Sequence, residues 1–275
     1  MARVLITGSN SGFGMLATLS LARAGHPVIA TMRDLAKGDE LRKLAADEDL
    51  PVETRRLDVG DPASIVEAMK DPAELDVVVN NAGFEVQSSV AMLDDDLLRR
   101  QLDTNVLGPM RVVRAVLPAW TARGSGTIVN VSSVAGIVGV PFGGAYAASK
   151  HALEALSESL HFEVGQNGIR VRLVEPGRFE TGFADKMVHP EGWDGSPDAA
   201  RCGRFREAMG KLQPPDAPEP DPQDVADVIV RAATDPDAPF RRFVGADAEL
   251  VSGVKRSMSL EEFEATMRAT LDWHE

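Results

Sequence analysis

Three side chains in two neighbouring stretches of the sequence carry groups that together can move a proton. Tyr146 and Lys150 are four residues apart in a stretch that begins at Gly144 and predicts a helix, so both lie on one face of it. A free tyrosine ionises near pH ~10, and a positive charge beside it favours the phenolate. Ser133 follows a predicted strand, which places its hydroxyl at the carboxyl end of a sheet, where open α/β folds bind ligands. The three groups predict acid–base chemistry on a ligand oxygen.

A glycine-rich turn near the N-terminus strengthens this interpretation, since a Tyr–Lys pair alone is more often a packing contact or part of a solvated face. Gly8, Gly12 and Gly14 lie between a predicted strand (residues 3–7) and a predicted helix (residues 15–24). Glycines let the backbone turn sharply and approach a pyrophosphate, and the free N–H groups of the following helix face the negative charge. A glycine turn without function is the alternative, but its position favours phosphate binding.

The end of the second predicted strand bears on which dinucleotide binds. Dinucleotide folds read the adenosine ribose there, with a carboxylate for the 2′-hydroxyl of NAD or an arginine for the 2′-phosphate of NADP. Met32 stands in the place of the carboxylate and Arg33 follows it, which predicts NADP(H) as the preferred cofactor, with NAD(H) possible. Asp34 leaves two readings open, because it can serve NAD or pair with Arg33 at the start of a helix.

The elements that must position these groups alternate between strands and helices along the whole chain. The fully apolar stretch at residues 75–79 is typical of a central parallel strand buried on both faces. This alternation predicts a doubly wound, Rossmann-type α/β fold with a parallel sheet of about seven strands and helices on both faces, in one domain of residues 1–275. The seven strands are expected at residues 3–7, 27–32, 52–59, 75–79, 127–131, 169–174 and 240–244, and the main helices at 15–24, 35–50, 94–120, 144–168, 222–233 and from 260 onward.

An asparagine interrupts the predicted helix at residues 94–120. Asn105 is a poor helix former, and Gly108 follows it closely, so we expect a bulge in the helix at this point. A buried, hydrogen-bonded asparagine with a purely structural role explains the residue equally well.

Five motifs in the same order resemble those of the short-chain dehydrogenase/reductase family, from Thr7 to about Gly245. They are Thr-Gly-x-x-x-Gly-x-Gly from Thr7 to Gly14, Asp58 after the third strand, Asn-Asn-Ala-Gly from Asn80 to Gly83, Ser133 with Tyr146-x-x-x-Lys150, and Pro-Gly-x-x-x-Thr from Pro176 to Thr181.

The resemblance implies a role for each matching residue. Asn105, Ser133, Tyr146 and Lys150 would be catalytic, with Asn105 holding a water that links Lys150 to solvent. Asp58 would hold the adenine ring, and Thr181 the nicotinamide carboxamide. The full cofactor set would be Gly8, Ser11, Gly12, Phe13, Gly14, Arg33, Asp58, Val59, Asn81, Ala82, Gly83, Tyr146, Lys150, Pro176, Gly177, Phe179 and Thr181. The resemblance also implies a homodimer or homotetramer that forms through the helices at 94–120 and 144–168.

Residues 182–222 match no motif and read as a substrate lid inserted into the domain. Large apolar residues alternate with charges there, which favours a medium-sized, mostly hydrophobic substrate, because loops on a rigid scaffold usually carry specificity. The substrate-binding candidates are Ser133, Phe142, Tyr146, Phe183 and Met187. A surface excursion with a small core of its own is the alternative reading.

Composition narrows the class of partner. The chain has 29 basic and 42 acidic side chains and a net charge of −13, which argues against nucleic acid and anionic membranes. The single cysteine, Cys202, allows no intrachain disulfide and no metal cluster, as is typical of cytoplasmic proteins. No apolar run is long enough for a membrane span, and the first strand leaves no room for a signal peptide.

These observations predict an NADP(H)-dependent oxidoreductase that interconverts a carbonyl and a secondary alcohol on a steroid-, retinoid- or ketone-like substrate. Two alternatives remain. A non-catalytic NAD(P)-sensing binding module would leave Ser133, Tyr146 and Lys150 without a task, and so would another nucleotide-binding α/β enzyme such as a methyltransferase.

Overall fold

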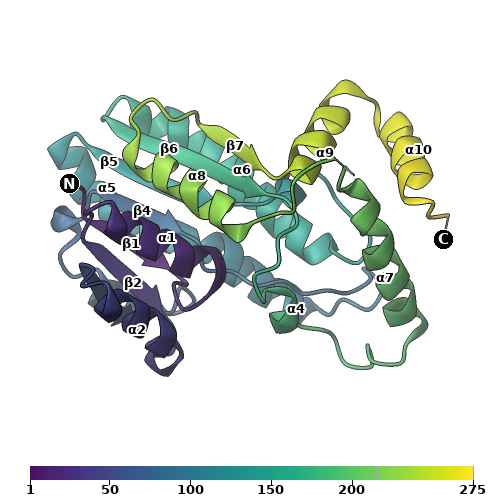
Figure 1. Cartoon of the computed structure of the whole chain (residues 1–275), viewed down its shortest axis with the longest axis horizontal. Coiled ribbons are helices and arrows are strands. Elements are labelled where there is room, and N and C mark those ends of the chain that lie inside the picture. The colour runs from purple at the N-terminus through teal and green to yellow at the C-terminus, as the bar shows by residue number, and fades with distance from the viewer. Residues whose placement is uncertain (215, 275) are drawn as a thin grey trace.

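A seven-stranded parallel sheet forms the centre of the molecule (Figure 1). The computed structural model describes residues 1–214 and 216–274, so residue 215 of the predicted lid lies outside the described part. The strand order is β3-β2-β1-β4-β5-β6-β7. Successive strands are added on one side from β1 to β3 and on the other side from β4 to β7, so the order of addition reverses between β1 and β4. This order confirms the predicted doubly wound fold. The strands are β1 (Val4–Thr7), β2 (Val28–Met32), β3 (Val52–Arg56), β4 (Val77–Asn80), β5 (Gly126–Val131), β6 (Ile169–Pro176) and β7 (Arg241–Val244).

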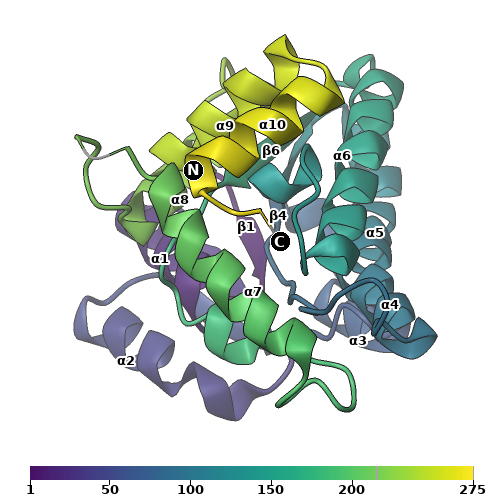
Figure 2. The same cartoon turned by 90° about the vertical axis from the view of Figure 1, so that its right-hand side faces the viewer.

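Helices cover both faces of the sheet (Figure 2). One face carries α1 (Gly12–Arg23), α2 (Asp39–Asp47) and α8 (Pro222–Thr234), and the other carries α3 (Pro62–Ala68), α5 (Gly108–Arg123) and α6 (Gly144–Gly165). The remaining helices are α4 (Asp95–Leu102), α7 (Pro197–Ala208), α9 (Ala246–Ser257) and α10 (Leu260–Leu271). None of the helices in the described residues has the length and apolar character needed to cross a membrane.

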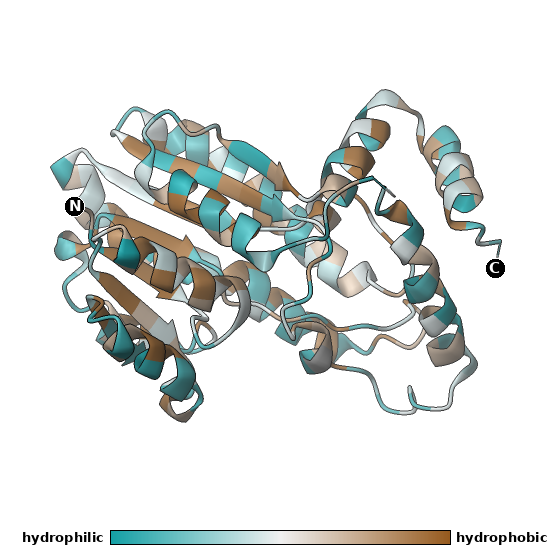
Figure 3. Ribbon diagram, in the orientation of Figure 1, coloured by the Kyte–Doolittle hydropathy of each residue, from teal (hydrophilic) through white to brown (hydrophobic). Residues whose placement is uncertain are grey.

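The two cores follow from the alternation of side chains along each strand. Val4 and Ile6 of β1 join the core under α1 and α8, whereas Leu5 between them joins the core under α5 and α6. Both sets are apolar, so β1 contributes to a hydrophobic core on each face of the sheet, and β1, β2, β4 and β5 are buried along their whole length. Figure 3 shows the brown, hydrophobic residues in the strands. A sheet buried on both sides is the expected consequence of helices that connect parallel strands.

The predicted helix at residues 94–120 is confirmed in outline and contains the expected bulge. The π-helical turn η3 (Asp103–Leu107) separates α4 from α5 and contains Asn105. The predicted helix at residues 35–50 is instead a 3₁₀ turn, η1 (Leu35–Gly38), followed by α2. The extended backbone that follows β2 ends at Asp34. The Asp34 carboxylate accepts a hydrogen bond from Ala36 N at 3.0 Å and thereby caps the 3₁₀ turn.

The helices α7 and α9 are absent from the elements predicted from the sequence. Ser196 marks the start of α7, since its hydroxyl accepts a hydrogen bond from Ala199 N at 3.0 Å and Pro197 occupies the first helical position. That pair of residues is a signal that the sequence offered. The start of α10 was recognised correctly, because Ser259 and Glu262 form the capping box in both directions.

The helices α7, α9 and α10 lie together at the end of the molecule toward which the strands point (Figure 1). They enclose a third apolar cluster, which we call the lid core. Part of the predicted lid thus has a core of its own. Its buried members are Val138, Phe142, Trp193, Cys202, Phe205, Leu212, Val251, Phe263 and Leu271.

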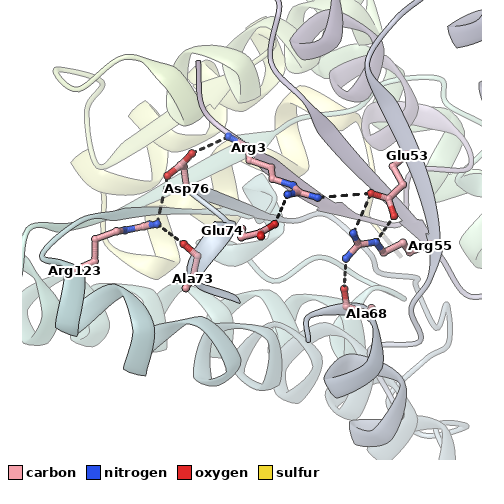
Figure 4. A network of polar contacts seen from close by, with 8 residues as sticks. All are labelled: Arg3, Glu53, Arg55, Ala68, Ala73, Glu74, Asp76 and Arg123. Carbon is pink, nitrogen blue, oxygen red and sulfur yellow. Dashed lines mark hydrogen bonds and ion pairs between the residues drawn. The ribbon is translucent and has the colours of Figure 1, made fainter. Parts of the chain in front are cut away.

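The opposite edge of the sheet carries an ion-pair network on the amino ends of the strands (Figure 4). Arg3 bonds Glu74, while Arg55 lies 2.6 Å from Glu53 and donates to Ala68 O at 2.9 Å. These side chains are largely solvated, so each pair contributes little, about 0–1 kcal/mol. Every one of their charges has a nearby partner, and this edge of the sheet reads as an ordinary polar surface.

Candidate active site

Tyr146 and Lys150 lie in the first two turns of α6, at the carboxyl ends of the central strands. Lys150 Nζ donates to Val131 O at the end of β5, at 2.8 Å. It lies 5.5 Å from the centroid of the Tyr146 ring. The spacing of four residues in a helix therefore brings the phenol of half-buried Tyr146 close to the amine of buried Lys150.

Ser133 lies beside them because β5 ends two residues earlier. Its Oγ accepts a hydrogen bond from Ala135 N at 3.2 Å, which caps a short 3₁₀ turn, and donates to Pro176 O at 3.4 Å. A side-chain hydrogen bond between Ser133 and Tyr146 lowers the pKa of the phenol. The structure thus brings the hydroxyl, the phenol and the amine together.

Burial dominates the titration of both groups on α6. It raises the pKa of Tyr146 well above the usual value, and the negative charge of Glu85 raises it further. Burial lowers the pKa of Lys150 to about 8, against the opposing effect of Glu154. The sequence led us to expect that Lys150 would favour the phenolate, but desolvation penalises the charged form more strongly. Tyr146 is therefore a neutral phenol, the form that can donate a proton.

Asn105 anchors the chain that enters this site from β4. Its Nδ2 donates to Phe84 O at 3.0 Å and to Ser149 Oγ at 3.1 Å, and its Oδ1 accepts from Phe84 N at 3.2 Å. A Cβ on Gly83 would lie only 3.2 Å from that Oδ1. The π turn aims this amide out of the helix, so Asn105 joins α6 to the segment after β4.

The glycine turn lies directly before the N-terminus of α1, where the sequence predicts phosphate binding. Gly8 and Gly12 adopt left-handed conformations with φ of 71° and 56°, and a Cβ on Gly14 would collide with Gly8 O. Ser11 does not cap α1 with its side chain, which leaves the first N–H groups free to bind an anion. The ammonium of Lys186 donates to Ser11 Oγ at 2.7 Å and adds a positive charge. These features fit a dinucleotide pyrophosphate.

Asn81 and Ala82 hold this turn against the end of β4. Asn81 Nδ2 donates to Thr7 O at 2.9 Å and to Gly8 O at 3.1 Å, and the backbone N–H groups of Asn81 and Ala82 both donate to Thr7 Oγ1 at 3.0 Å. The Asn81 amide is thus engaged in fixing the glycine turn, a task that the motif did not reveal.

At the predicted ribose end, Arg33 is exposed directly after β2. Met32 is buried with Leu41 under α2, so its side chain belongs to the core. Within the described residues Asp34 forms no ion pair with Arg33, because its carboxylate caps η1 instead. This geometry removes one of the two readings that the sequence left open and leaves the Arg33 guanidinium available.

Asp58 and Val59 follow β3 on the same side. Asp58 Oδ1 accepts a hydrogen bond from Gly60 N at 3.0 Å, which is a turn-forming contact. Val59 is buried against Gly108, and its carbonyl accepts from Arg111 Nη1 at 3.1 Å.

The Pro176 to Thr181 segment closes over the glycine turn from β6. Gly177 N donates to Val244 O at 2.8 Å, which fixes the start of the segment. Farther on, a Cβ on Gly12 would lie 3.3 Å from Thr181 Cβ, and the Phe13 and Phe179 rings pack edge to face at 5.7 Å. Segments distant in sequence therefore enclose the space above the carboxyl ends of β1 and β6.

The three apolar substrate candidates have different surroundings. The Phe183 ring lies 6.0 Å from that of Tyr146. Met187 Sδ contacts Arg206 Nη1 of α7 at 3.8 Å. Phe142 is buried in the lid core against Trp193, and its φ of 64° is unusual for a bulky residue.

Sequence reasoning missed three charged residues around the site: Glu85, Glu154 and Lys186. Glu154 had a signal, since it follows Lys150 by four residues on the same helix face. The other two come from loops that only the folded chain brings near α6 and α1.

Comparisons with known proteins agree with this geometry. A model of the short chain dehydrogenase family matches residues 2–192. The uncharacterized oxidoreductase YusZ of Bacillus subtilis is 37% identical over 84% of each chain, and retinol dehydrogenase 8 of Bos taurus is 38% identical over 87% of this chain and 80% of the relative. A solved short-chain dehydrogenase from Streptomyces avermitilis has a TM-score of 0.78 at 33% identity, covering 98% of this chain and 100% of that one.

This family membership excludes the methyltransferase alternative. The residues that match the family's motifs lie at the carboxyl ends of β1, β4, β5 and β6. The chain therefore belongs to the short-chain dehydrogenase family and is an NAD(P)-dependent oxidoreductase that acts on CH–OH groups.

Proposed function

We propose that this oxidoreductase uses NADP(H) to interconvert a carbonyl and a secondary alcohol on a medium-sized, mostly hydrophobic substrate. One observation supports this most strongly: the half-buried, neutral phenol of Tyr146 lies next to Ser133 and Lys150, at the same end of the sheet as the glycine turn. A positioned acid in a water-poor site is what carbonyl reduction requires.

In this proposal the nicotinamide supplies or accepts the hydride. The Ser133 hydroxyl donates a hydrogen bond to the substrate oxygen, and Tyr146 transfers its phenolic proton to that oxygen as negative charge develops. The ammonium of Lys150 stabilises the phenolate that remains and binds ribose hydroxyls. Asn105 holds the segment around Phe84 against Ser149 and thereby fixes the shape of the site.

The cofactor preference rests on Arg33, which is exposed at the ribose end, with Met32 buried and Asp34 occupied as a cap. A guanidinium there binds the 2′-phosphate of NADP(H), which NAD(H) lacks.

The substrate class rests on the apolar side chains near Tyr146. Phe183 is closest to the phenol, Met187 comes next along the chain, and residues 182–222 serve as the lid. The similarity to retinol dehydrogenase 8 supports an apolar substrate of comparable size.

The proposal also includes a homodimer or homotetramer in the cytoplasm. Phe162 on α6 is 82% exposed, which is the expected property of a large apolar side chain that packs on a second copy.

Replacing Tyr146 tests the chemistry directly. In the Tyr146→Phe variant the ring still packs but the transferable proton is absent, so we expect turnover to fall by about 10²–10⁴-fold. NADPH binding should persist. The measurement is NADPH oxidation with a panel of ketones, alongside cofactor binding by fluorescence. Near wild-type turnover in the variant would disprove Tyr146 as the acid.

A further inference from the structure

Glu85 is a charged residue in the candidate site to which the proposed reaction assigns no task. It follows Phe84, and the side-chain amide of Asn105 bonds both the N–H and the carbonyl of Phe84. Its own carbonyl accepts a hydrogen bond from Val188 N at 2.9 Å, directly after Met187. The backbone of Glu85 is therefore fixed between a catalytic candidate and a substrate candidate.

The Glu85 side chain points toward the start of α6. Its Oε1 would lie 3.9 Å from a Cβ placed on Gly143, three residues before Tyr146. The carboxylate is close enough to the phenol to raise the pKa of Tyr146. Burial raises the pKa of the Cys202 thiol in α7, and the charge of Glu85 raises it further.

Within the described residues this carboxylate has no hydrogen-bond donor and no ion-pair partner. Burial raises the pKa of Glu85 to about 7, and only the more distant charge of Arg206 opposes that effect. Arg206 itself contacts Met187, and its carbonyl accepts a hydrogen bond from Arg178. Glu85 is half-buried, so its carboxylate has lost part of its hydration without gaining a partner, and such a group in a native fold calls for an explanation.

We propose that Glu85 is a substrate-binding residue whose carboxylate accepts a hydrogen bond from a hydroxyl or ammonium group next to the reacting carbon. This inference rests on the proposed function, since it places the reacting carbon at Tyr146. The preferred substrate is then an α-hydroxy or α-amino ketone with an apolar chain. The chain packs on Phe183 and Met187, and the donor satisfies Glu85.

The chemistry favours strong discrimination. A bound substrate covers the half-buried Glu85 carboxylate, so an analogue that lacks the matching donor leaves this carboxylate unpaired and is rejected. A hydrogen bond to a charged acceptor corresponds to about ten- to a hundredfold in kcat/KM.

Three ketones with the same alkyl chain test the proposal: methyl octyl ketone, hydroxymethyl octyl ketone and aminomethyl octyl ketone. With NADPH, the wild-type chain should reduce one or both substituted ketones at least about tenfold more efficiently than methyl octyl ketone. Which of the two is preferred distinguishes a hydroxyl donor from an ammonium donor. In Glu85→Leu the ratio should fall to about one, and in Glu85→Gln, which keeps an amide acceptor, to an intermediate value.

Glu207→Gln is the matched control, because Glu207 is an exposed glutamate on α7 next to Arg206. It should keep the wild-type ratio. An equal loss for all three ketones in the Glu85 variants would overturn the proposal and show that Glu85 acts only on Tyr146 or on the lid.

Calorimetric titration of the three ketones into the NADP⁺-loaded chain separates this inference from the proposed function. If no ketone is turned over but the substituted ketones bind more tightly in a Glu85-dependent way, the assigned reaction fails and the binding site stands. Equal binding of all three ketones by the wild-type chain would overturn the binding site.

Discussion

At the scale of single residues, local spacing singled out Ser133, Tyr146 and Lys150, and the glycine turn and the family resemblance turned that spacing into a catalytic prediction. A spacing of four residues in a helix and a position directly after a strand are rules of backbone geometry, so placing these three residues near one another needed no tertiary information. Glu85 could not be found this way, because it reaches Tyr146 only through the path of the loop after β4. Asp34 is an intermediate case, since its capping role depends on where the helix begins.

Arg33 gives the first prediction at this scale. Arg33→Ala should weaken NADPH binding about ten- to a hundredfold and leave NADH nearly unchanged, because only the 2′-phosphate loses its charged hydrogen bond. The measurement is kcat/KM for both reduced cofactors with one ketone. Lys43→Ala, which removes an exposed cation from α2, controls for the general effect of charge in a chain of net charge −13. A wild-type preference for NADH would refute the assignment.

At the scale of elements, the sequence was most informative where a residue type does not suit the helix or strand around it. Asn105 in a helix indicated a bulge, and the structure has a π turn there. The lid was harder, because its apolar residues have no clear periodicity and its helix α7 packs on α9 and α10 through the lid core. Tertiary packing of that kind leaves little trace in a local pattern.

The 3₁₀ turn η5 (Ala184–Lys186) contacts the glycine turn through Lys186 and Ser11, and this contact between the proposed lid and the proposed pyrophosphate site gives the second prediction. Lys186→Gln should weaken NADPH and NADH by the same factor, about three- to tenfold, since both carry the pyrophosphate and the ammonium is exposed and screened. Fluorescence titration gives both dissociation constants. Arg33→Ala is the contrasting variant, because it affects NADPH alone. Unchanged dissociation constants for both cofactors would mean that Lys186 only holds the Ser11 side chain in place and does not bind the pyrophosphate.

At the scale of the whole molecule, strand order and layering could be predicted because alternating apolar strands and helices permit few topologies. The charged cluster that joins β6, β7 and α6 could not be. Arg241 lies 2.7 Å from Glu154 and 3.2 Å from Glu175, which is completely buried. Only the register of β7 beside β6 brings these charges together.

This cluster should make the stability of the fold depend on pH. Burial and the neighbouring Glu154 raise the pKa of Glu175 to about 9, against the attraction of Arg241. An unfolded glutamate titrates near ~4.3, so the folded chain keeps a proton on Glu175 that the unfolded chain has lost. The contribution is fully present below the unfolded pKa, and it is lost as pH rises through about 9. The slope is at most about 1.4 kcal/mol per pH unit.

Glu175→Gln imitates the protonated carboxyl and cannot lose its proton. We expect the free energy of unfolding in urea, measured from about pH 5 to about pH 9, to fall less steeply in this variant than in the wild-type chain. Glu191→Gln, at an exposed glutamate, should keep the wild-type slope. Parallel curves for wild type and Glu175→Gln would mean that Arg241 holds Glu175 as a carboxylate in the folded chain, and that the attraction of this ion pair outweighs burial.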